Sequence, residues 1–176
     1  MIPARPLVAA LVLAALAACS SDPTRGYAFG GAFDEEVTTV AVPVFDNATF
    51  VPGVERELTD AIIKRIQAQT PWRVASLGRA DTTLSGAVVG VDQRSLSVVP
   101  ETGFTQEQAV RVTVRFTWRD NRTGEDLVAV DGFSAAATFT PARGTSGEPG
   151  ERPELGRRDA IDELAEAIVE RLRSRW

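Results

Sequence analysis

The sequence predicts an α+β domain in which two amphipathic helices cover one face of a largely antiparallel sheet of about four or five strands. Two segments, residues 54–69 and 154–173, repeat apolar side chains at helical spacing. Between them lie several stretches in which apolar and polar residues alternate, as they do in half-buried strands. Because the chain runs strand, helix, several strands, helix, both helices can pack on the same side of the sheet.

The first strand is predicted over residues 37–45, where Val40, Val42 and Val44 alternate with smaller or polar residues. Pro43 has no N–H group to donate, so it either lies at an edge of the sheet or has its N–H side unpaired. Residues 46–49 (Asp-Asn-Ala-Thr) have the composition of a turn.

The first helix is predicted over residues 54–69. Its apolar residues recur every four positions, and the acidic residues in its first turns interact favourably with the positive end of the helix dipole. Pro71 disfavours helical geometry at Thr70 and so ends the helix. The apolar residues are Val54, Leu58, Ile62 and Ile66. A short strand is predicted at residues 72–76, followed by a long strand or bent pair over 81–99.

The clearest strand covers residues 109–118, where five apolar residues alternate with arginine and threonine. Residues 120–124 then form a predicted hairpin loop, and residues 126–138 return as the antiparallel partner. Residues 141–153 are rich in Pro, Gly and Ser and predict a surface loop. The last helix is predicted over residues 154–173, with Ile161, Leu164 and Ile168 among its buried residues.

The N-terminus has the pattern of a secretory signal. Arg5 precedes an apolar segment, residues 7–18, that is too short to span a bilayer. Leu16-Ala17-Ala18-Cys19 resembles a bacterial lipobox, in which the cysteine thiol is acylated and becomes the first mature residue. The alternative is an ordinary signal peptide with a cysteine nearby by chance. Because Ser20 rather than Asp follows, the resemblance favours a lipid-anchored protein on the periplasmic face of the outer membrane.

Three segments follow from this interpretation: a signal peptide over residues 1–18, a lipidated tether over 19–36 and a single domain over 37–176. The formal charge of the whole chain is −5, and removal of residues 1–18 takes away Arg5 and makes it −6. This acidity argues against nucleic acid as a partner. The membrane would be contacted through the acyl chains on Cys19.

Composition also argues against catalysis. The chain has no histidine, the commonest general base and nitrogen ligand of metals, and its one lysine, Lys64, lies within a helical pattern. A hydrolase based on carboxylates is disfavoured because no paired acids are evident. We therefore expect no enzymatic activity, no metal site and no cofactor.

Arg111, Arg115 and Arg119 are the candidate binding residues. They share one face of the clearest strand, with Thr113 and Thr117 between them. Guanidinium groups bind phosphate and carboxylate bidentately, so the stripe is able to hold anionic groups. The alternative is an ordinary solvated face whose charge is balanced by acids such as Glu101 and Glu107.

Taken together, these segments resemble the LptE family of lipopolysaccharide-assembly lipoproteins. The resemblance rests on the lipobox cysteine and on residues 39–50 (TVAVPVFDNATF), 54–62 (VERELTDAI) and 80–86 (ADTTLSG), together with the terminal helix. It implies a small sheet carrying two helices and a role as a plug inside an LptD-like outer-membrane β-barrel that delivers lipopolysaccharide to the outer leaflet. Lipopolysaccharide contact is linked to basic sheet residues in the family, and Arg111, Arg115 and Arg119 match them in type.

A second interpretation remains open. Residues 39–47 (TVAVPVFDN) also resemble the opening strand of curli-secretion and penicillin-binding-protein-activator lipoproteins, which regulate a secretion pore or an envelope enzyme. Those proteins alternate strands and helices. Here a run of strands separates only two helices, which favours the LptE-like interpretation.

Overall fold

The computed structural model describes residues 37–98, 105–141 and 152–174, all of them within one compact unit, Ala32–Trp176. The predicted signal peptide, the tether and Cys19 lie outside the described residues, as does most of the predicted loop over 141–153.

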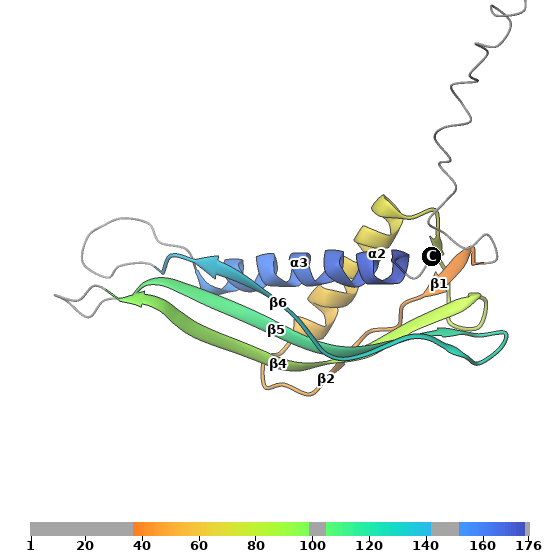
Figure 1. The fold of residues 1–176 in the computed structure, drawn as a ribbon, viewed down its shortest axis with the longest axis horizontal. Coiled ribbons are helices and arrows are strands. Elements are labelled where there is room, and N and C mark those ends of the chain that lie inside the picture. The colour runs from red at the N-terminus through yellow and green to blue at the C-terminus, as the bar shows by residue number, and fades with distance from the viewer. Residues whose placement is uncertain (1–36, 99–104, 142–151, 175–176) are drawn as a thin grey trace, which may run out of the picture. The chain divides into compact units, whose positions relative to one another are not determined.

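One mixed, mostly antiparallel sheet forms the body of this unit (Figure 1). The strand order is β3-β1-β4-β5-β6, and β2 pairs with β4 further along the same edge as β1. β1 pairs in parallel with β3 and with β4, and β2 also pairs in parallel with β4. The β4–β5 and β5–β6 pairings are antiparallel. The strands are β1 (Thr39–Ala41), β2 (Asp46–Asn47), β3 (Arg73–Val74), β4 (Thr82–Val98), β5 (Thr105–Asp120) and β6 (Asp126–Phe139).

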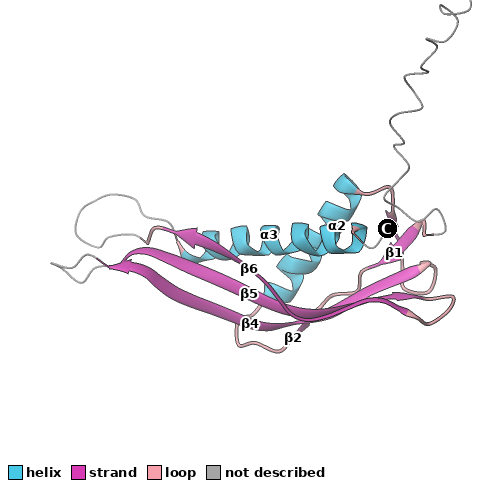
Figure 2. Cartoon of the chain, in the orientation of Figure 1, coloured by secondary structure: helices cyan, strands magenta, loops and turns pink. Residues whose placement is uncertain are grey.

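Both helices, α2 (Val54–Gln69) and α3 (Pro153–Arg173), lie on one side of this sheet (Figure 2). The predicted fold class is therefore confirmed, and the bounds predicted for the first helix are those observed. Gly53 precedes α2 with a φ of 87°, a conformation that favours glycine over residues with a Cβ. The backbone carbonyl of Gly53 accepts from the N–H groups of Arg56 and Glu57, which starts the helix.

The core lies between the two helices and the face of the sheet that they cover. The alternation predicted for residues 110–118 is confirmed, because Val110, Val112, Val114, Phe116 and Trp118 are all buried. Trp118 contacts Trp72, which follows α2, with ring centroids 5.2 Å apart. Apolar residues of both helices complete this core: Val54, Leu58, Ile62, Ile66, Ile161, Leu164, Ile168 and Leu172.

The predicted strand over residues 37–45 is interrupted in the structure. Pairing with β4 stops after Ala41 and resumes at Asp46, so part of the predicted turn is the short strand β2. The registers explain the break: Ala41 faces Thr83 and Asp46 faces Ala87, so the edge segment contains one residue more than β4 does. Pro43 lies in this interruption, where its missing N–H costs no ladder hydrogen bond.

Several register shifts interrupt the β4–β5 and β5–β6 ladders, and two of them lie next to glycines. The β4–β5 register shifts between Val88 and Gly90, which leaves Val89 as an extra residue. The β5–β6 register shifts between Val114 and Phe116, opposite Asp131 and Gly132, and Gly132 has a φ of 70°. Gly90 follows the extra residue Val89, and Gly86 allows a close approach of the neighbouring strand, because a Cβ at Gly86 would lie 2.4 Å from the Arg115 carbonyl oxygen.

Candidate interaction surface on the uncovered sheet face

The second face of the sheet carries the predicted arginine stripe. Arg111, Arg115 and Arg119 are exposed, and they alternate along β5 with residues that are buried beneath the helices. Successive arginines of the stripe are about 13 Å apart along a strand of ordinary rise. Small or hydroxyl-bearing residues, among them Ser85, Thr113 and Ser134, occupy the neighbouring positions of β4, β5 and β6.

The three arginines have different surroundings. Arg119 Nε donates to Asp126 Oδ1 at 2.7 Å, and this hydrogen bond raises the pKa of Arg119 and lowers that of Asp126. Arg111 faces Asp92 in the β4–β5 register, but no ion pair joins them. Within the described residues, the side chains of Arg111 and Arg115 make no hydrogen bond or ion pair. These two guanidinium groups are therefore the ones available to a ligand.

Arg115 borders a shallow hollow of about 620 Å³ on this face. The residues that line it include the small side chains of Ser85, Ala87 and Ala129. Asp46 and Asp131 also line it, so the hollow is bordered by one guanidinium group and two carboxylates. This arrangement can bind polar groups through one guanidinium group and two carboxylates.

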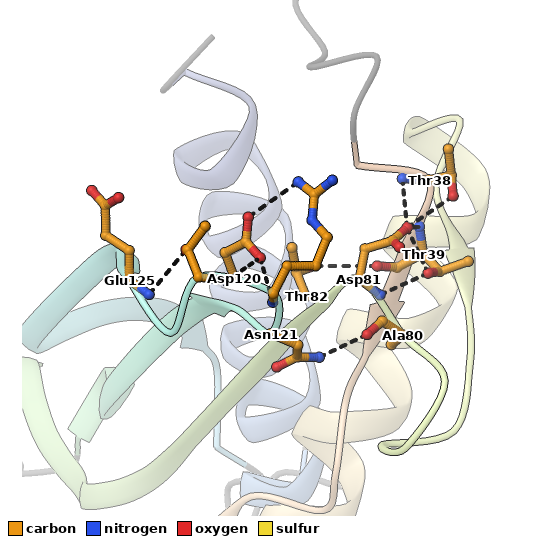
Figure 3. Close-up of polar contacts among 10 residues, drawn as sticks. Thr38, Thr39, Ala80, Asp81, Thr82, Asp120, Asn121 and Glu125 are labelled. Carbon is orange, nitrogen blue, oxygen red and sulfur yellow. Dashed lines mark hydrogen bonds and ion pairs between the residues drawn. The ribbon is translucent and has the colours of Figure 1, made fainter.

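The carboxylate of Asp81 forms hydrogen bonds with the residues at the start of β1 (Figure 3). The Oδ2 atom of Asp81 accepts from the backbone N–H groups and the hydroxyl groups of both Thr38 and Thr39, at 2.8–3.1 Å. The Asp81 N–H donates in return to Thr39 Oγ1 at 2.9 Å. These hydrogen bonds stabilise the charged form and lower the pKa of Asp81 from 3.8 to about 2. Asp81 thus fixes the register of β1 against β4.

The β5–β6 hairpin is tied to the same corner of the sheet. Asn121 Nδ2 donates to the Ala80 carbonyl at 2.8 Å, and Thr83 Oγ1 donates to Asn121 Oδ1 at 2.9 Å. Asp120 accepts from the guanidinium and the backbone N–H of Arg122, and these bonds lower the pKa of Asp120. Side-chain hydrogen bonds therefore join β1, β4 and the β5–β6 hairpin at the end of the sheet where β1 begins (Figure 3).

We expect Asp81→Asn to destabilise the domain by about 2 kcal/mol at pH 7, because the acceptor of four hydrogen bonds loses its charge. The folded-state pKa lies below the unfolded value, so the contribution of Asp81 is present above pH 4 and is lost as the pH falls toward 2. Urea unfolding of both proteins at a series of pH values measures this. A difference that stayed constant from pH 7 to pH 2 would contradict the role given to the carboxylate.

A second feature, which the sequence analysis did not single out, lies in the loop before α2. Phe50 is fully exposed. Its loop is nevertheless well ordered by Asn47, whose Nδ2 donates to the Val51 carbonyl at 2.8 Å and whose Oδ1 accepts from the Thr49 N–H at 2.8 Å. A fixed loop lowers the conformational entropy that would be lost if Phe50 contacted another protein.

The described residues contain no group of three or more potential metal-ligating His, Cys, Asp or Glu side chains. Neither helix in this part of the chain is long and apolar enough to cross a bilayer.

The model of the LptE family, described as "Lipopolysaccharide-assembly", matches residues 37–176, which is most of the chain. The chain belongs to the LptE family. The resemblance found in the sequence is thereby confirmed, and LptE is a family of non-enzymatic lipoproteins associated with lipopolysaccharide assembly. No curated protein matches the chain significantly in sequence.

Solved structures share the fold of this LptE-family chain at low sequence identity. Rare lipoprotein B from Shewanella oneidensis is 16% identical with a TM-score of 0.52, over 78% of this chain and 95% of that one. A protein from Xanthomonas campestris is 10% identical with a TM-score of 0.53, over 79% and 85%. A hypothetical protein from Chlamydia trachomatis is 11% identical with a TM-score of 0.52, over 78% and 96%. At these identities the likeness concerns the fold alone.

Proposed function

We propose that this LptE-family protein is an outer-membrane lipoprotein, anchored through Cys19, that fills and supports an LptD-like β-barrel during delivery of lipopolysaccharide to the outer leaflet. Family membership is the observation that carries this proposal. The fold supports it physically. A small, well-packed domain with one uncovered face can occupy a barrel lumen as a rigid body, whereas a loosely packed one would lose conformational entropy on insertion.

We place the contact with the barrel and its lipid cargo on the uncovered sheet face. Arg111 and Arg115 have no ion-pair partner among the described residues, and they lie on a rigid strand about 13 Å apart. Lipopolysaccharide carries phosphate groups, which guanidinium groups bind bidentately. Arg119 contributes less, because Asp126 already neutralises it at 2.7 Å.

Charge reversal should distinguish the effect of these two arginines on binding from the effect of the protein's overall charge. We expect Arg111→Glu together with Arg115→Glu to weaken lipopolysaccharide binding at least tenfold, since hydrogen bonds between charged groups contribute about 1.5–3 kcal/mol each. Arg56→Glu with Arg158→Glu is the matched control, because it makes the same charge change at exposed positions on the helices. Binding to immobilised lipopolysaccharide and thermal melting measure affinity and folding. Equal affinity of the two double variants would remove the stripe from the binding surface.

The plug role itself is tested by purification of the tagged, lipidated protein from outer membranes in mild detergent. The proposal expects a large β-barrel of the LptD type in a defined stoichiometric complex. Recovery of the protein without a barrel would overturn it. Recovery with a secretion pore or a cell-wall enzyme instead would favour a regulatory lipoprotein.

A further inference from the structure

Strand β6 forms one open edge of the sheet. It is the last strand in the order, and β5 is the only strand that pairs with it among the described residues. Natural sheets protect such edges with charges, prolines or bulges, because a bare edge pairs readily with another strand. The first half of β6 has these devices: Asp126, Asp131 and the bulge at Gly132.

The second half of β6, Phe133–Phe139, has none of them. Its seven residues, Phe-Ser-Ala-Ala-Ala-Thr-Phe, contain no charge, no proline and no glycine. They pair regularly with β5, from Val114 to Gln108, without a register shift. The other open edge of the sheet differs in this respect, since the part of β4 beyond its pairing with β2 carries Asp92 and Arg94.

This uncharged segment is close to a palindrome centred on Ala136. If a second copy of the strand lay antiparallel to it about a two-fold axis, Phe133 would face Phe139, and Ser134 would face Thr138. Ala135 would face Ala137, and Ala136 would face its own counterpart. Aromatic pairs and hydroxyl pairs at directly opposed positions stabilise antiparallel strands. The self-pairing therefore places like with like at every position.

The faces of the strand agree with this arrangement. Phe133, Ala135, Ala137 and Phe139 share the helix-covered face, where Phe133 packs edge-on against Phe116 with centroids 5.7 Å apart. Ser134, Ala136 and Thr138 are exposed on the uncovered face. A two-fold axis perpendicular to the sheet keeps each set on its own side, so two copies would form one continuous sheet with a closed, isologous contact.

We propose that two copies of this chain, when not engaged with another partner, associate through antiparallel pairing of Phe133–Phe139 centred on Ala136. This association of two copies goes beyond the plug role. It covers the unprotected edge of β6 before the protein assembles with a barrel. The small side chains at the centre leave no steric obstacle on the uncovered face, and the absence of charge avoids like-charge repulsion between the two copies.

A symmetric cross-link tests the geometry. In the Cys19→Ser chain, which otherwise has no cysteine, Ala136→Cys would place two thiols directly opposite each other, with Cβ atoms about 5 Å apart. Ala129→Cys is the matched control: it is exposed on the same face of the same strand, but its two copies would be about 45 Å apart. Under mild oxidation we expect the disulfide dimer to form at least tenfold faster with Ala136→Cys. Equal rates would overturn the proposal.

A second measurement needs no cysteine. Ala136→Glu would place two carboxylates opposite each other and should leave the chain monomeric in sedimentation equilibrium, whereas Ala129→Glu should retain the dimer. Far-UV circular dichroism verifies that both variants fold. A Cys19→Ser chain that remained monomeric up to about 1 mM, or a dimer unaffected by Ala136→Glu, would contradict the proposal whether or not the protein binds a barrel.

Discussion

Replacement of Gly86 by alanine is expected to destabilise the domain by about 3 kcal/mol and to lower its Tm by about 10 °C. A Cβ at this position would lie 2.4 Å from the Arg115 carbonyl oxygen and 2.6 Å from Phe45 Cε1. The oxygen belongs to the backbone of the neighbouring strand and cannot move aside without opening the β4–β5 ladder. Phe45 is buried, so its ring cannot turn into solvent either.

The matched control is Gly78→Ala. Gly78 lies in a turn, and a Cβ there would meet no atom within 4 Å, so its Tm should remain close to that of the parent. Thermal melting of the three proteins by circular dichroism measures both effects. Equal Tm values for Gly86→Ala and Gly78→Ala would show that the edge segment and β4 are not packed as closely as described.

Replacement of Cys19 by serine is expected to move the protein almost completely from the membrane fraction to the soluble periplasmic fraction. Each buried CH₂ group of an acyl chain contributes about 0.8 kcal/mol to membrane binding, so loss of the acyl chains removes most of the affinity. Ser20→Ala, next to it, should leave the protein in the membrane. Fractionation and intact-mass spectrometry measure this, and an unchanged membrane fraction for Cys19→Ser would overturn the lipoprotein assignment.

The elements that sequence analysis predicted well are those whose pattern is local. The helix over residues 54–69 has its apolar stripe, acidic first turns and terminating Pro71 within one segment, and its bounds are those observed. The alternation in β5 likewise predicted which side chains are buried and which face the arginines are on. Both helices could be assigned to one face from the order of elements alone.

Features that depend on pairing between distant segments were not predictable. Asp81 binds Thr38 and Thr39 across 42–43 residues of sequence, and no local pattern identifies that contact. The interruption at Pro43 follows from a mismatch in length between the edge segment and β4. The exposure of Phe50 depends on hydrogen bonds of Asn47, although an aromatic residue between turn-forming residues and Val-Pro-Gly is a signal that could have been used.

The candidate site was predicted in part. The stripe of three arginines lies on one face as expected, but only the register of β5 with β6 reveals that Asp126 pairs with Arg119. For this arginine the balancing charge comes from Asp126 on the hairpin partner strand, whereas Glu101 lies outside the described residues. The hollow beside Arg115 depends on the position of β2 and on the small residues of β4 and β6, which no single segment shows.

The most direct test of the central claim is site-specific photo-cross-linking in intact cells. A photoreactive residue at Ser85, exposed on the uncovered sheet face, is compared with one at Asp162, exposed on α3. We expect a strong cross-link from Ser85 to an LptD-like barrel and a much weaker one from Asp162. A barrel cross-link that came from Asp162 and not from Ser85 would contradict this claim.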